Sequence, residues 1–414
     1  MKRPATILLA LMKLDIGGAE THAVVLARHL TEMGYKVIMA SNGGVFEAEI
    51  ARYGVKHYRV PLHLPKISLL WRSIRAMRKI VRNEKVDLIH AHARVPAFVA
   101  AFMGRPENVR FITTAHFNFD YRYGLRYLSQ WGEKTIAVSE DIQEHLIKHF
   151  RVPAENIVVI PNGIDTDVFR PLPGPGAEQK NTGGQEGQRK KKQGDRGKQQ
   201  EAAPDERKSR EEQGAASEDD GREIRLTLVS RLDGEPLAEV AVNLIAACEQ
   251  VYGAWPDLRL AIVGDGNRRA EVEKRARECN TRLGKEIAVL LGARTDVNQI
   301  MAGSDLVVGV SRVALEAMAC AKPVLLAGPQ GFGGLLEPQK LAFFQKDNFT
   351  ARLTGEKTSA ENLTASLQDF FNRPGSWRTA AGRVFRDFIE KEYSSRQMSQ
   401  RVAQVYQEVF NQRR

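Results

Sequence analysis

Short apolar runs alternate with amphipathic helical patterns through most of this chain, and this alternation restricts the fold more than any other feature. Before residue 172, runs with the length and composition of strands occupy residues 6–11, 36–40, 56–60, 88–90, 110–113, 135–138 and 157–160. Helical periodicity falls between them, at residues 20–33, 46–53, 69–82 and 141–149. Strands that alternate with helices in this way predict a parallel sheet with helices on both faces.

The pattern stops at a low-complexity segment and then restarts. Residues 173–221 contain no aromatic residue and no Ile, Leu, Val or Met, so they cannot bury enough apolar surface to offset the entropy of ordering. We therefore expect a disordered linker or insertion at residues 172–223. Beyond it, strand patterns at 225–230, 258–263, 288–291 and 306–308 alternate with helical patterns at 237–252, 268–283 and 297–302. The sequence predicts an α/β protein of two doubly wound, Rossmann-like domains, 1–171 and 224–393, and a final amphipathic helix at 394–414.

Charge and composition limit the classes of partner. The net charge is +11, and residues 172–222 hold 11 basic and 11 acidic residues, so the excess lies on the folded parts and suits anionic partners such as nucleotide phosphates. Nucleic acid is not expected, because no aromatic residues are interleaved with the basic ones. The three cysteines lack the spacing of a disulfide framework or a zinc site. This use of cysteine implies the reducing cytoplasm, and the sequence shows neither an apolar run that could cross a bilayer nor a signal-peptide pattern.

A carboxylate stands alone in an apolar segment near the last third of the chain. Residues 305–308 read as the end of a buried strand, Ser311 can cap the helix that follows, and Lys322-Pro323 stops it. This strand, turn and helix place Glu316 near a helix N-terminus at the sheet edge where ligands dock in open α/β folds. The alternative is a first-turn glutamate that only offsets the helix dipole.

The first strand leads into adjacent glycines, Gly17-Gly18, and a helix follows directly. Glycines there let the backbone approach a ligand closely, and the free amides of a helix start attract phosphate. The Gly-x-Gly-x-x-Gly series of dinucleotide-binding proteins is absent, so a dinucleotide site is not indicated, and a simple tight turn remains an alternative. Histidines also end two strands, in His90-Ala91-His92 and at His116; these are either functional groups or polar strand terminators.

Taken together, these residues resemble glycosyltransferase family 4, whose two-domain fold is called GT-B. The likeness covers nearly all of the chain outside the insertion, and its motifs occur in order as Gly17-Gly18-Ala19-Glu20, His90-Ala91-His92, Thr114-Ala115-His116, Val138-Ser139, Pro161-Asn162-Gly163-Ile164-Asp165, Ser230-Arg231-Leu232, Val263-Gly264-Asp265-Gly266 and Leu315-Glu316-Ala317-Met318-Ala319. Enzymes of this family move a sugar from a nucleotide-diphosphate sugar to an acceptor, with retention at the anomeric carbon and without a bound metal. The final helix of such proteins crosses back onto the N-terminal domain.

The resemblance implies two catalytic residues. His116 would lie near the transferred sugar, and Arg231 would neutralise the diphosphate. Cleavage of the sugar–phosphate bond leaves growing negative charge on the nucleoside diphosphate, and a preorganised guanidinium can stabilise that charge.

The resemblance also implies a donor site shared by both domains. Gly17 and Gly18 would approach the diphosphate across the cleft, and Glu316 would bind the ribose hydroxyls. The motif positions of Asn162 and Gly264 add these two residues to the donor site. The implied substrate is a nucleotide sugar, and neither a metal nor another cofactor is expected.

Two positions depart from the family pattern. A lysine usually follows the arginine by five residues and also grips the diphosphate, but Pro236 stands there. A second glutamate usually precedes Glu316 by eight residues and binds the donor sugar, but Val308 stands there. Arg312, one turn before Glu316, is our hypothesis for the missing positive charge. The glycine-rich run 328–334 offers amides as another compensation, or is a flexible loop.

A basic amphipathic segment covers residues 69–82. Leu69, Leu70, Trp71, Ile74, Met77, Ile80 and Val81 form its apolar stripe, and five cations lie beside it. Such a helix can lie on an anionic membrane, but its stripe can equally pack on the sheet. The sequence thus leaves open a peripheral membrane contact.

The sequence predicts a metal-independent retaining glycosyltransferase that acts on a lipid, glycan or small-glycoside acceptor. One rival is a catalytically weakened GT-B protein that binds a nucleotide or glycan, which the residues at 236 and 308 suggest. A second rival is an epimerase or phosphorylase of the same fold, for which neither a cofactor-lysine motif nor epimerase-type carboxylates are visible.

Overall fold

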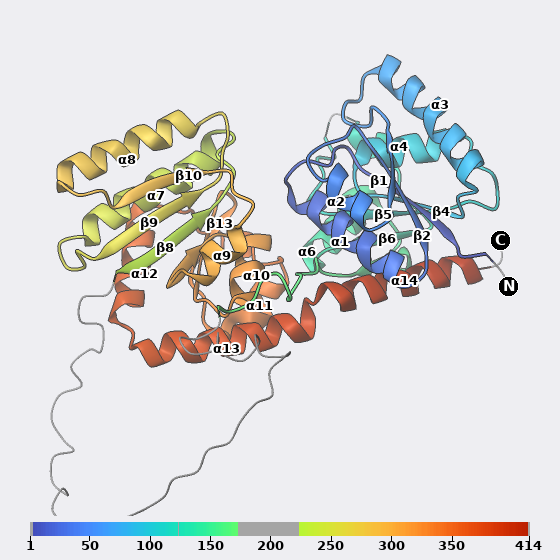
Figure 1. The fold of residues 1–414 in the computed structure, drawn as a ribbon. Coiled ribbons are helices and arrows are strands. Elements are labelled where there is room, and N and C mark those ends of the chain that lie inside the picture. The colour runs from blue at the N-terminus through green and yellow to red at the C-terminus, as the bar shows by residue number, and fades with distance from the viewer. Residues whose placement is uncertain (1–2, 123, 173–222, 413–414) are drawn as a thin grey trace, which may run out of the picture.

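The computed structural model describes residues 3–122, 124–172 and 223–412, and it contains two sheets, one parallel and one parallel except for its edge strand, each at the centre of its own lobe (Figure 1). We call them the N lobe, built on the seven-stranded sheet, and the C lobe, built on the six-stranded sheet. This architecture confirms the predicted α/β fold of GT-B type. The disordered insertion predicted at 172–223 falls almost wholly on residues outside those described.

The N-lobe sheet is parallel throughout and has the order β3-β2-β1-β4-β5-β6-β7. Its strands are β1 (Thr6–Ala10), β2 (Lys36–Ser41), β3 (Lys56–Arg59), β4 (Leu88–Ala91), β5 (Arg110–Ala115), β6 (Lys134–Ala137) and β7 (Ile157–Val159). The helices between them are α1 (Gly18–Glu32), α2 (Glu47–Arg52), α3 (Ile67–Glu84), α4 (Arg94–Phe102), α5 (Leu125–Leu128), α6 (Glu140–His145), the π-helical turn η1 (Leu146–Phe150) and the 3₁₀ turn η2 (Ala154–Asn156).

The C-lobe sheet repeats this winding with the order β10-β9-β8-β11-β12-β13. Its strands are β8 (Ile224–Val229), β9 (Leu258–Val263), β10 (Ala288–Gly292), β11 (Leu306–Val308), β12 (Val324–Gly328) and β13 (Gly331–Leu335). Its helices are α7 (Glu235–Val251), α8 (Arg269–Leu283), α9 (Val297–Ala302), α10 (Arg312–Ala319), η4 (Pro338–Lys340), α11 (Leu341–Gln345), η5 (Arg352–Thr354), α12 (Ala360–Asn372) and α13 (Gly375–Glu392).

The glycine-rich run 328–334 is not a flexible loop. It turns back as the edge strand β13, antiparallel to β12, with Gly328 paired to Gly331. A Cβ at Gly331 would lie 2.0 Å from the carbonyl oxygen of Ala351, so this glycine is needed for close backbone packing. The run therefore has a structural reason that does not involve a ligand.

Both faces of each sheet are covered, which explains the uninterrupted apolar runs. All five residues of β1 are buried: Ile7 and Leu9 belong to the cluster shared with α1, whereas Leu8 and Ala10 belong to the cluster shared with α3 and α4. A strand buried on both faces cannot show polar alternation.

The chain returns to the N lobe through its last helices, as predicted. Figure 1 shows α13 along the base of the C lobe and α14 (Ser395–Asn411) continuing along the base of the N lobe. The apolar face of α14, which includes Val402 and Tyr406, belongs to the same buried cluster as α1. Where the chain crosses, Ile164 and Ser394 form a parallel β-bridge.

The basic segment at 69–82 lies within α3 and mostly follows the packing alternative. Its residues Ile74, Met77, Ile80 and Val81 are buried against the N-lobe sheet. The first turns of the helix differ, because Ile67 and Trp71 expose 75% and 59% of their surface. Among the described residues, no helix is both long and apolar enough to span a membrane.

Candidate active site

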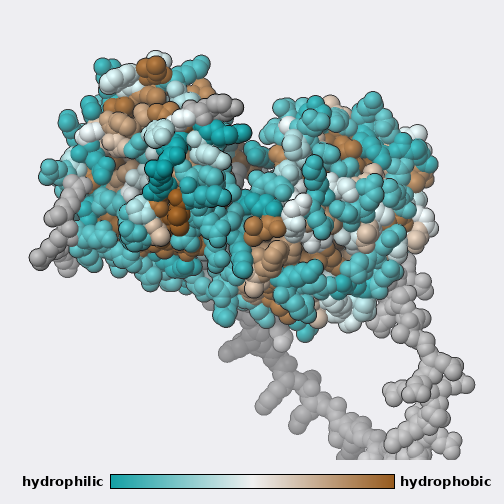
Figure 2. Space-filling view, turned by 180° about the vertical axis from the view of Figure 1, so that it is seen from behind, coloured by the Kyte–Doolittle hydropathy of each residue, from teal (hydrophilic) through white to brown (hydrophobic). Residues whose placement is uncertain are grey.

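The predicted site residues gather at the reversal points of the two sheets. In each sheet the strand order reverses between the first and fourth strands, β1 and β4 in the N lobe and β8 and β11 in the C lobe. Ligands of open α/β sheets bind outside the carboxyl ends of the strands at such points. Gly17 follows β1, Arg231 follows β8 and Arg312 follows β11. Figure 2 shows the lobes meeting below a notch that opens between them.

Electrostatic contacts link the two reversal points across the lobes. The guanidinium of Arg231 acts on the carboxyl of Glu20 in α1, although burial outweighs it and raises the pKa of Glu20. Arg312 lies near His22 and donates a hydrogen bond of 3.4 Å to the carbonyl of Gly163. The N-lobe and C-lobe halves of the predicted site therefore face each other.

The start of α1 presents free amides, as a phosphate site requires. Gly17 occupies the N-cap position with extended backbone and has no side chain to cap the helix, while the Glu20 carboxylate reaches back over Gly17 and interacts with the Glu20 amide. A Cβ on Gly18 would meet no atom within 4 Å, so the space in front of the first turn is open. An uncapped helix N-terminus beside open space is a suitable anion site.

Histidines from three elements form a buried group beside α1. His92 follows β4, His116 follows β5, and His22 enters from α1. Burial lowers the pKa of His22 and of His92 well below the usual value, and it lowers that of His116 to about 4. All three imidazoles are therefore neutral near pH 7.

His90 belongs to the same motif but has a different role. Its Nδ1 lies 2.8 Å from the hydroxyl of Tyr406, and its Nε2 lies 2.6 Å from that of Thr114. Both ring nitrogens are thus engaged, and His90 ties β4 to α14 and β5. Within the motif His90-Ala91-His92, His90 therefore has the structural role, and only His92 remains a candidate functional group.

Asn162 lies beside the histidine group and is buried, with 8% of its surface exposed. Its side chain interacts with both His22 and His116 and raises their pKa values, against the larger opposite effect of burial. Asp165 from the same motif has a structural role, because it accepts hydrogen bonds from the amides of Asp167 and Val168 and pairs with an arginine of α1.

Arg231 is exposed in the turn after β8. It forms no salt bridge with any residue in the described ranges, and it follows Ser230 in a turn that packs on Gly264. Gly264 has φ +145°, and a Cβ there would lie 1.8 Å from the carbonyl oxygen of Ser230. The glycine therefore lets the β9 turn support the Arg231 turn, a reason for its presence that does not require donor contact.

Arg312 and Glu316 form a pair on the first turns of α10. Arg312 Nε lies 2.7 Å from Glu316 Oε1, and the side chains expose only 13% and 11% of their surface. Burial raises the pKa of Glu316, while the guanidinium of Arg312 opposes that shift. If Arg312 supplies the positive charge that Pro236 does not, it does so while its guanidinium is paired with the Glu316 carboxylate.

The helix start differs from the sequence expectation in one respect. Ser311 stands at the N-cap of α10 as predicted, but its side chain caps no amide of the helix. Its backbone has φ +53°, and its hydroxyl instead accepts a hydrogen bond from Asn348. The cap prediction is wrong because the left-handed backbone of Ser311 directs the residue toward the loop after α11.

Pro236 and Val308, the two residues that depart from the family pattern, both fit their places in the C lobe without strain. Pro236 occupies the first turn of α7, where its missing amide hydrogen costs nothing. Val308 is fully buried in the C-lobe core. These positions contribute neither a cation nor a carboxylate to the site.

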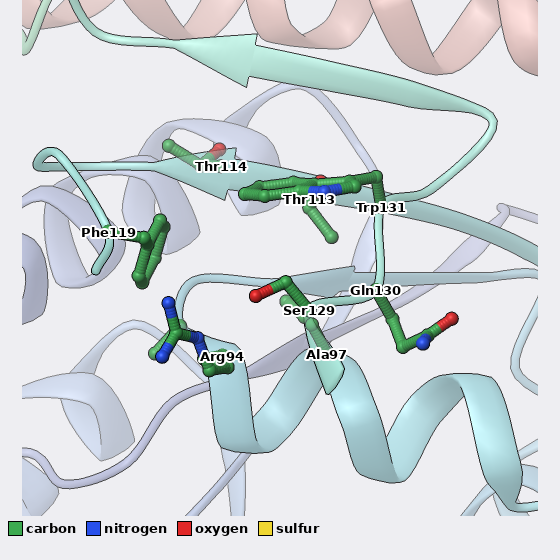
Figure 3. A pocket seen from close by; sticks show the side chains of 10 residues that line it. Arg94, Ala97, Thr113, Thr114, Phe119, Ser129, Gln130 and Trp131 are labelled. Carbon is green, nitrogen blue, oxygen red and sulfur yellow. The ribbon is translucent and has the colours of Figure 1, made fainter. Parts of the chain in front are cut away.

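Figure 3 shows a small cavity between Arg94, Phe119 and Trp131, near the ends of β4 and β5. Its volume of about 10 Å³ is roughly what one water molecule needs. The Arg94 guanidinium lies over the Phe119 ring at 5.2 Å. A sugar does not fit this cavity, so it is separate from the predicted donor site.

Sequence reasoning missed Glu20 and His22 as members of the site. Both lie on the first turns of α1, directly after the predicted glycines. Their spacing of two residues matches no ligand motif, and only the approach of β4, β5 and the C lobe brings partners to them. The available signal was two polar side chains in the first turns of a helix whose next five residues, 23–27, are apolar and buried.

Comparison with protein-family models decides the family. Residues 16–168 match the model described as Glycosyltransferase Family 4, and residues 223–357 match the model described as Glycosyl transferases group 1. The chain belongs to glycosyltransferase family 4. The two matches cover the N lobe and most of the C lobe of this glycosyltransferase.

Curated relatives are distant. The glycosyltransferase is 25% identical over 301 residues to the Escherichia coli UDP-Gal:alpha-D-GlcNAc-diphosphoundecaprenol alpha-1,3-galactosyltransferase, with 67% of each chain covered. It is 23% identical over 177 residues to a phosphatidylinositol N-acetylglucosaminyltransferase subunit from Arabidopsis thaliana, covering 38% of this chain. It spans only 39% of the length of that plant relative.

Solved structures share the fold over the whole chain. A glycosyltransferase from Rickettsia africae superposes with a TM-score of 0.70 at 18% identity, covering 100% of both chains. Anabaena Alr3699/HepE, solved in complex with UDP and glucose, superposes with a TM-score of 0.66 at 18% identity, covering 98% of this chain and 100% of that one. At this level of identity the likeness shows the fold alone.

Proposed function

We propose that this glycosyltransferase moves a sugar from a nucleotide-diphosphate sugar to a lipid-linked acceptor, with retention at the anomeric carbon and without a metal in the transfer step. One observation carries the proposal: the start of α1 and the exposed Arg231 face each other from the reversal points of two sheets, with the Glu20 carboxylate between them where an anionic ligand would take its place. Two positive groups placed on opposite sides of a notch suit a diphosphate held between them.

The proposed donor site divides the nucleotide sugar between the lobes. Arg231 and the amides at Gly18 would stabilise the charge that develops on the leaving diphosphate. Glu316 would accept hydrogen bonds from the ribose, because its pair with Arg312 holds the carboxylate in place. His116, half-buried beside the notch, would face the transferred sugar.

The proposed acceptor carries a lipid. The named substrates of the Escherichia coli relative are a UDP-sugar and a diphosphoundecaprenol-linked sugar, which suggests the same classes here. The first turns of α3 support membrane approach, since Ile67 and Trp71 are exposed beside Arg72 and Arg75, which are exposed as well. Apolar and cationic side chains together suit the interface of an anionic bilayer.

The test is transfer from a panel of UDP-glucose, UDP-galactose, UDP-GlcNAc and GDP-mannose to a polyprenyl-diphosphate sugar. Product is followed by mass spectrometry, the anomeric configuration by NMR, and metal dependence by adding EDTA. We expect transfer from one UDP-sugar with retained configuration and unchanged rate in EDTA. Arg231→Met should lower kcat/KM by roughly 10–100-fold, in line with the loss of a charge-assisted hydrogen bond.

Arg277→Gln is the matched control, because Arg277 is an exposed cation on α8. Inverted products or a rate that needs added metal would contradict those parts of the proposal. A second candidate is favoured by Pro236 and Val308: a protein that binds the donor but turns it over weakly. Binding of a UDP-sugar without transfer or hydrolysis anywhere on the panel would select that candidate.

A further inference from the structure

Three histidines meet at the edge of the N-lobe sheet, outside any role yet assigned to two of them. His22, His92 and His116 each offer a ring nitrogen, and these nitrogens all lie within 4.8 Å of one another. They come from α1 and from the ends of β4 and β5, three elements fixed by the core. It is the one such group found among the described residues.

The spacing within the group suits a metal ion. His92 Nδ1 and His116 Nε2 lie 3.2 Å apart. In the metal-free chain the two rings share a hydrogen bond at this distance. Tetrahedral zinc with bonds of about 2.0–2.1 Å holds its ligand nitrogens about 3.3 Å apart, so an ion could replace that hydrogen bond with little movement of either ring. The His22 ring stands edge-on to the His116 ring at 4.9 Å between centroids. His22 can therefore supply a third nitrogen from a different direction.

The ring nitrogens also lack the partners that buried polar atoms normally have. Both nitrogens of His22, Nε2 of His92, Nδ1 of His116 and Oδ1 of the neighbouring Asn162 are buried without a hydrogen-bond partner among the described residues, whereas His92 Nδ1 and His116 Nε2 pair with each other. Asn162 lies close enough to act on the pKa values of His22 and His116 without completing a hydrogen bond to either. His22 and His92 expose only 1% and 2% of their surface. Unpaired buried polar atoms are rare in folded proteins, and a bound ion or an ordered water is the usual partner that completes them.

The neighbouring His90 provides the internal contrast. Its ring lies only 4.1 Å from that of His92, yet both of its nitrogens are bonded to hydroxyl groups. The fold thus satisfies a buried histidine fully where the histidine has a structural role. In the adjacent three-histidine group only the contact between His92 Nδ1 and His116 Nε2 is made, and the other four ring nitrogens have no partner among the described residues.

We propose that His22, His92 and His116 bind a divalent first-row transition metal, with Zn²⁺ the best match to three neutral imidazoles. Imidazole nitrogens suit zinc and its neighbours rather than magnesium or calcium, which prefer oxygen ligands. His116 is half-buried, so a water or another small ligand could reach a fourth position on the ion. The Asn162 side chain, which interacts with His22 and His116, is placed to orient them as an outer partner.

Occupancy would have a consequence that rests on the proposed function. A metal bound to Nε2 of His116 removes that nitrogen from any contact with the transferred sugar. Zn²⁺ should therefore inhibit transfer, whereas EDTA should not. The site would be an inhibitory metal site and would take no part in the reaction. Metal binding itself is measured without donor or acceptor, so its failure is distinct from failure of the proposed transfer.

The experiment uses the untagged, chelator-treated full chain titrated with Zn²⁺ against a chromophoric chelator, and with Co²⁺ to follow visible absorption. We expect one Zn²⁺ ion per chain and the visible bands of tetrahedral Co²⁺. His22→Gln and His92→Gln should each weaken Zn²⁺ affinity by at least roughly tenfold. His149→Gln is the matched control, because His145 and His149 form another close histidine pair, with ring centroids 4.8 Å apart.

A wild-type chain that binds no stoichiometric Zn²⁺ overturns the proposal, and so does binding that His149→Gln abolishes while both cluster variants retain it. Circular dichroism shows whether each variant folds. If neither cluster variant folds, X-ray absorption of the zinc-loaded wild-type chain decides: three imidazole nitrogens at about 2.0 Å support the site, and a shell of oxygens refutes it.

Discussion

Replacing Gly18 by alanine should change stability and donor binding in opposite directions. Gly18 is the first residue of α1, its φ is not positive, and an added Cβ would meet no atom within 4 Å. Alanine is therefore compatible with the native backbone and restricts the unfolded chain. We expect the free energy of unfolding to rise by about 0.4–1 kcal/mol, measured as a shift of the urea midpoint.

The same methyl group should weaken donor binding. If the amides at the start of α1 hold the diphosphate, a Cβ in the open space before the helix displaces it from them. Loss of one charge-assisted hydrogen bond is worth about 1.5–3 kcal/mol. This corresponds to a roughly 10–150-fold higher Kd, which calorimetric titration with UDP and with UDP-galactose would measure.

Gly375→Ala is the control for this prediction. Gly375 opens α13 in the same way that Gly18 opens α1, and it too has open space around it, but α13 lies along the base of the C lobe. It should gain similar stability and bind UDP as the wild-type chain does. A Gly18→Ala variant with unchanged Kd for both ligands would refute the placement of the diphosphate at α1.

Three further predictions concern the stability of the scaffold. Gly264→Ala should lower the free energy of unfolding by more than about 3 kcal/mol or prevent folding, because its Cβ would lie 1.8 Å from a backbone carbonyl oxygen. Gly253→Ala is the control, because Gly253 has open space around it and the substitution should not cause such a loss. Urea unfolding of the two variants compares these effects. Arg386→Met should lower the unfolding free energy by roughly 2–3 kcal/mol, since Arg386 donates to three backbone carbonyls at 2.6–3.1 Å; exposed Arg383→Met is its control, and equal effects would contradict the assignment. The folded-state pKa of His116 is about 4, below the ordinary value of 6.5, so its contribution is present above pH 6.5 and is lost as pH falls toward 4. Between about pH 7 and pH 5.5 this group alone should cost metal-free protein roughly 1 kcal/mol, and urea midpoints that do not fall over this range would refute it.

Most of the fold could be predicted because its strands are buried on both faces. The strands at 258–263 and 306–308 were predicted at the observed bounds, since unbroken branched apolar runs leave little ambiguity. Helix α4 was missed because Pro96 in its first turn resembles a helix breaker, although proline is tolerated there. Strand β13 was missed because its glycines suit a loop, and only the close backbone of Ala351 explains them.

The candidate site could be predicted in part. Residues in the turns that follow strands, such as Gly17, His116 and Arg231, were expected at one edge of their sheets, because parallel strands end there together. The Arg312–Glu316 bond follows from helical spacing, but the depth of its burial does not. The left-handed backbone of Ser311 and the meeting of His22 with two strand ends depend on tertiary packing, which no local pattern records.

The β-bridge between Ile164 and Ser394 fixes how the lobes can move. The outgoing chain passes through Ile164 toward the C lobe, the returning chain passes through Ser394, and reciprocal backbone bonds of 2.7 and 2.9 Å flank the bridge. With both passages side by side, the lobes share a joint about which one can swing while both cores stay intact. Such a swing would have to part the contacts that cross between the lobes away from this joint, such as the largely buried Arg352–Asp141 pair at 2.5 Å and the bond from the Asp141 amide to the carbonyl of Lys346, so substrate access and product exit would depend on these contacts rather than on the core of either half.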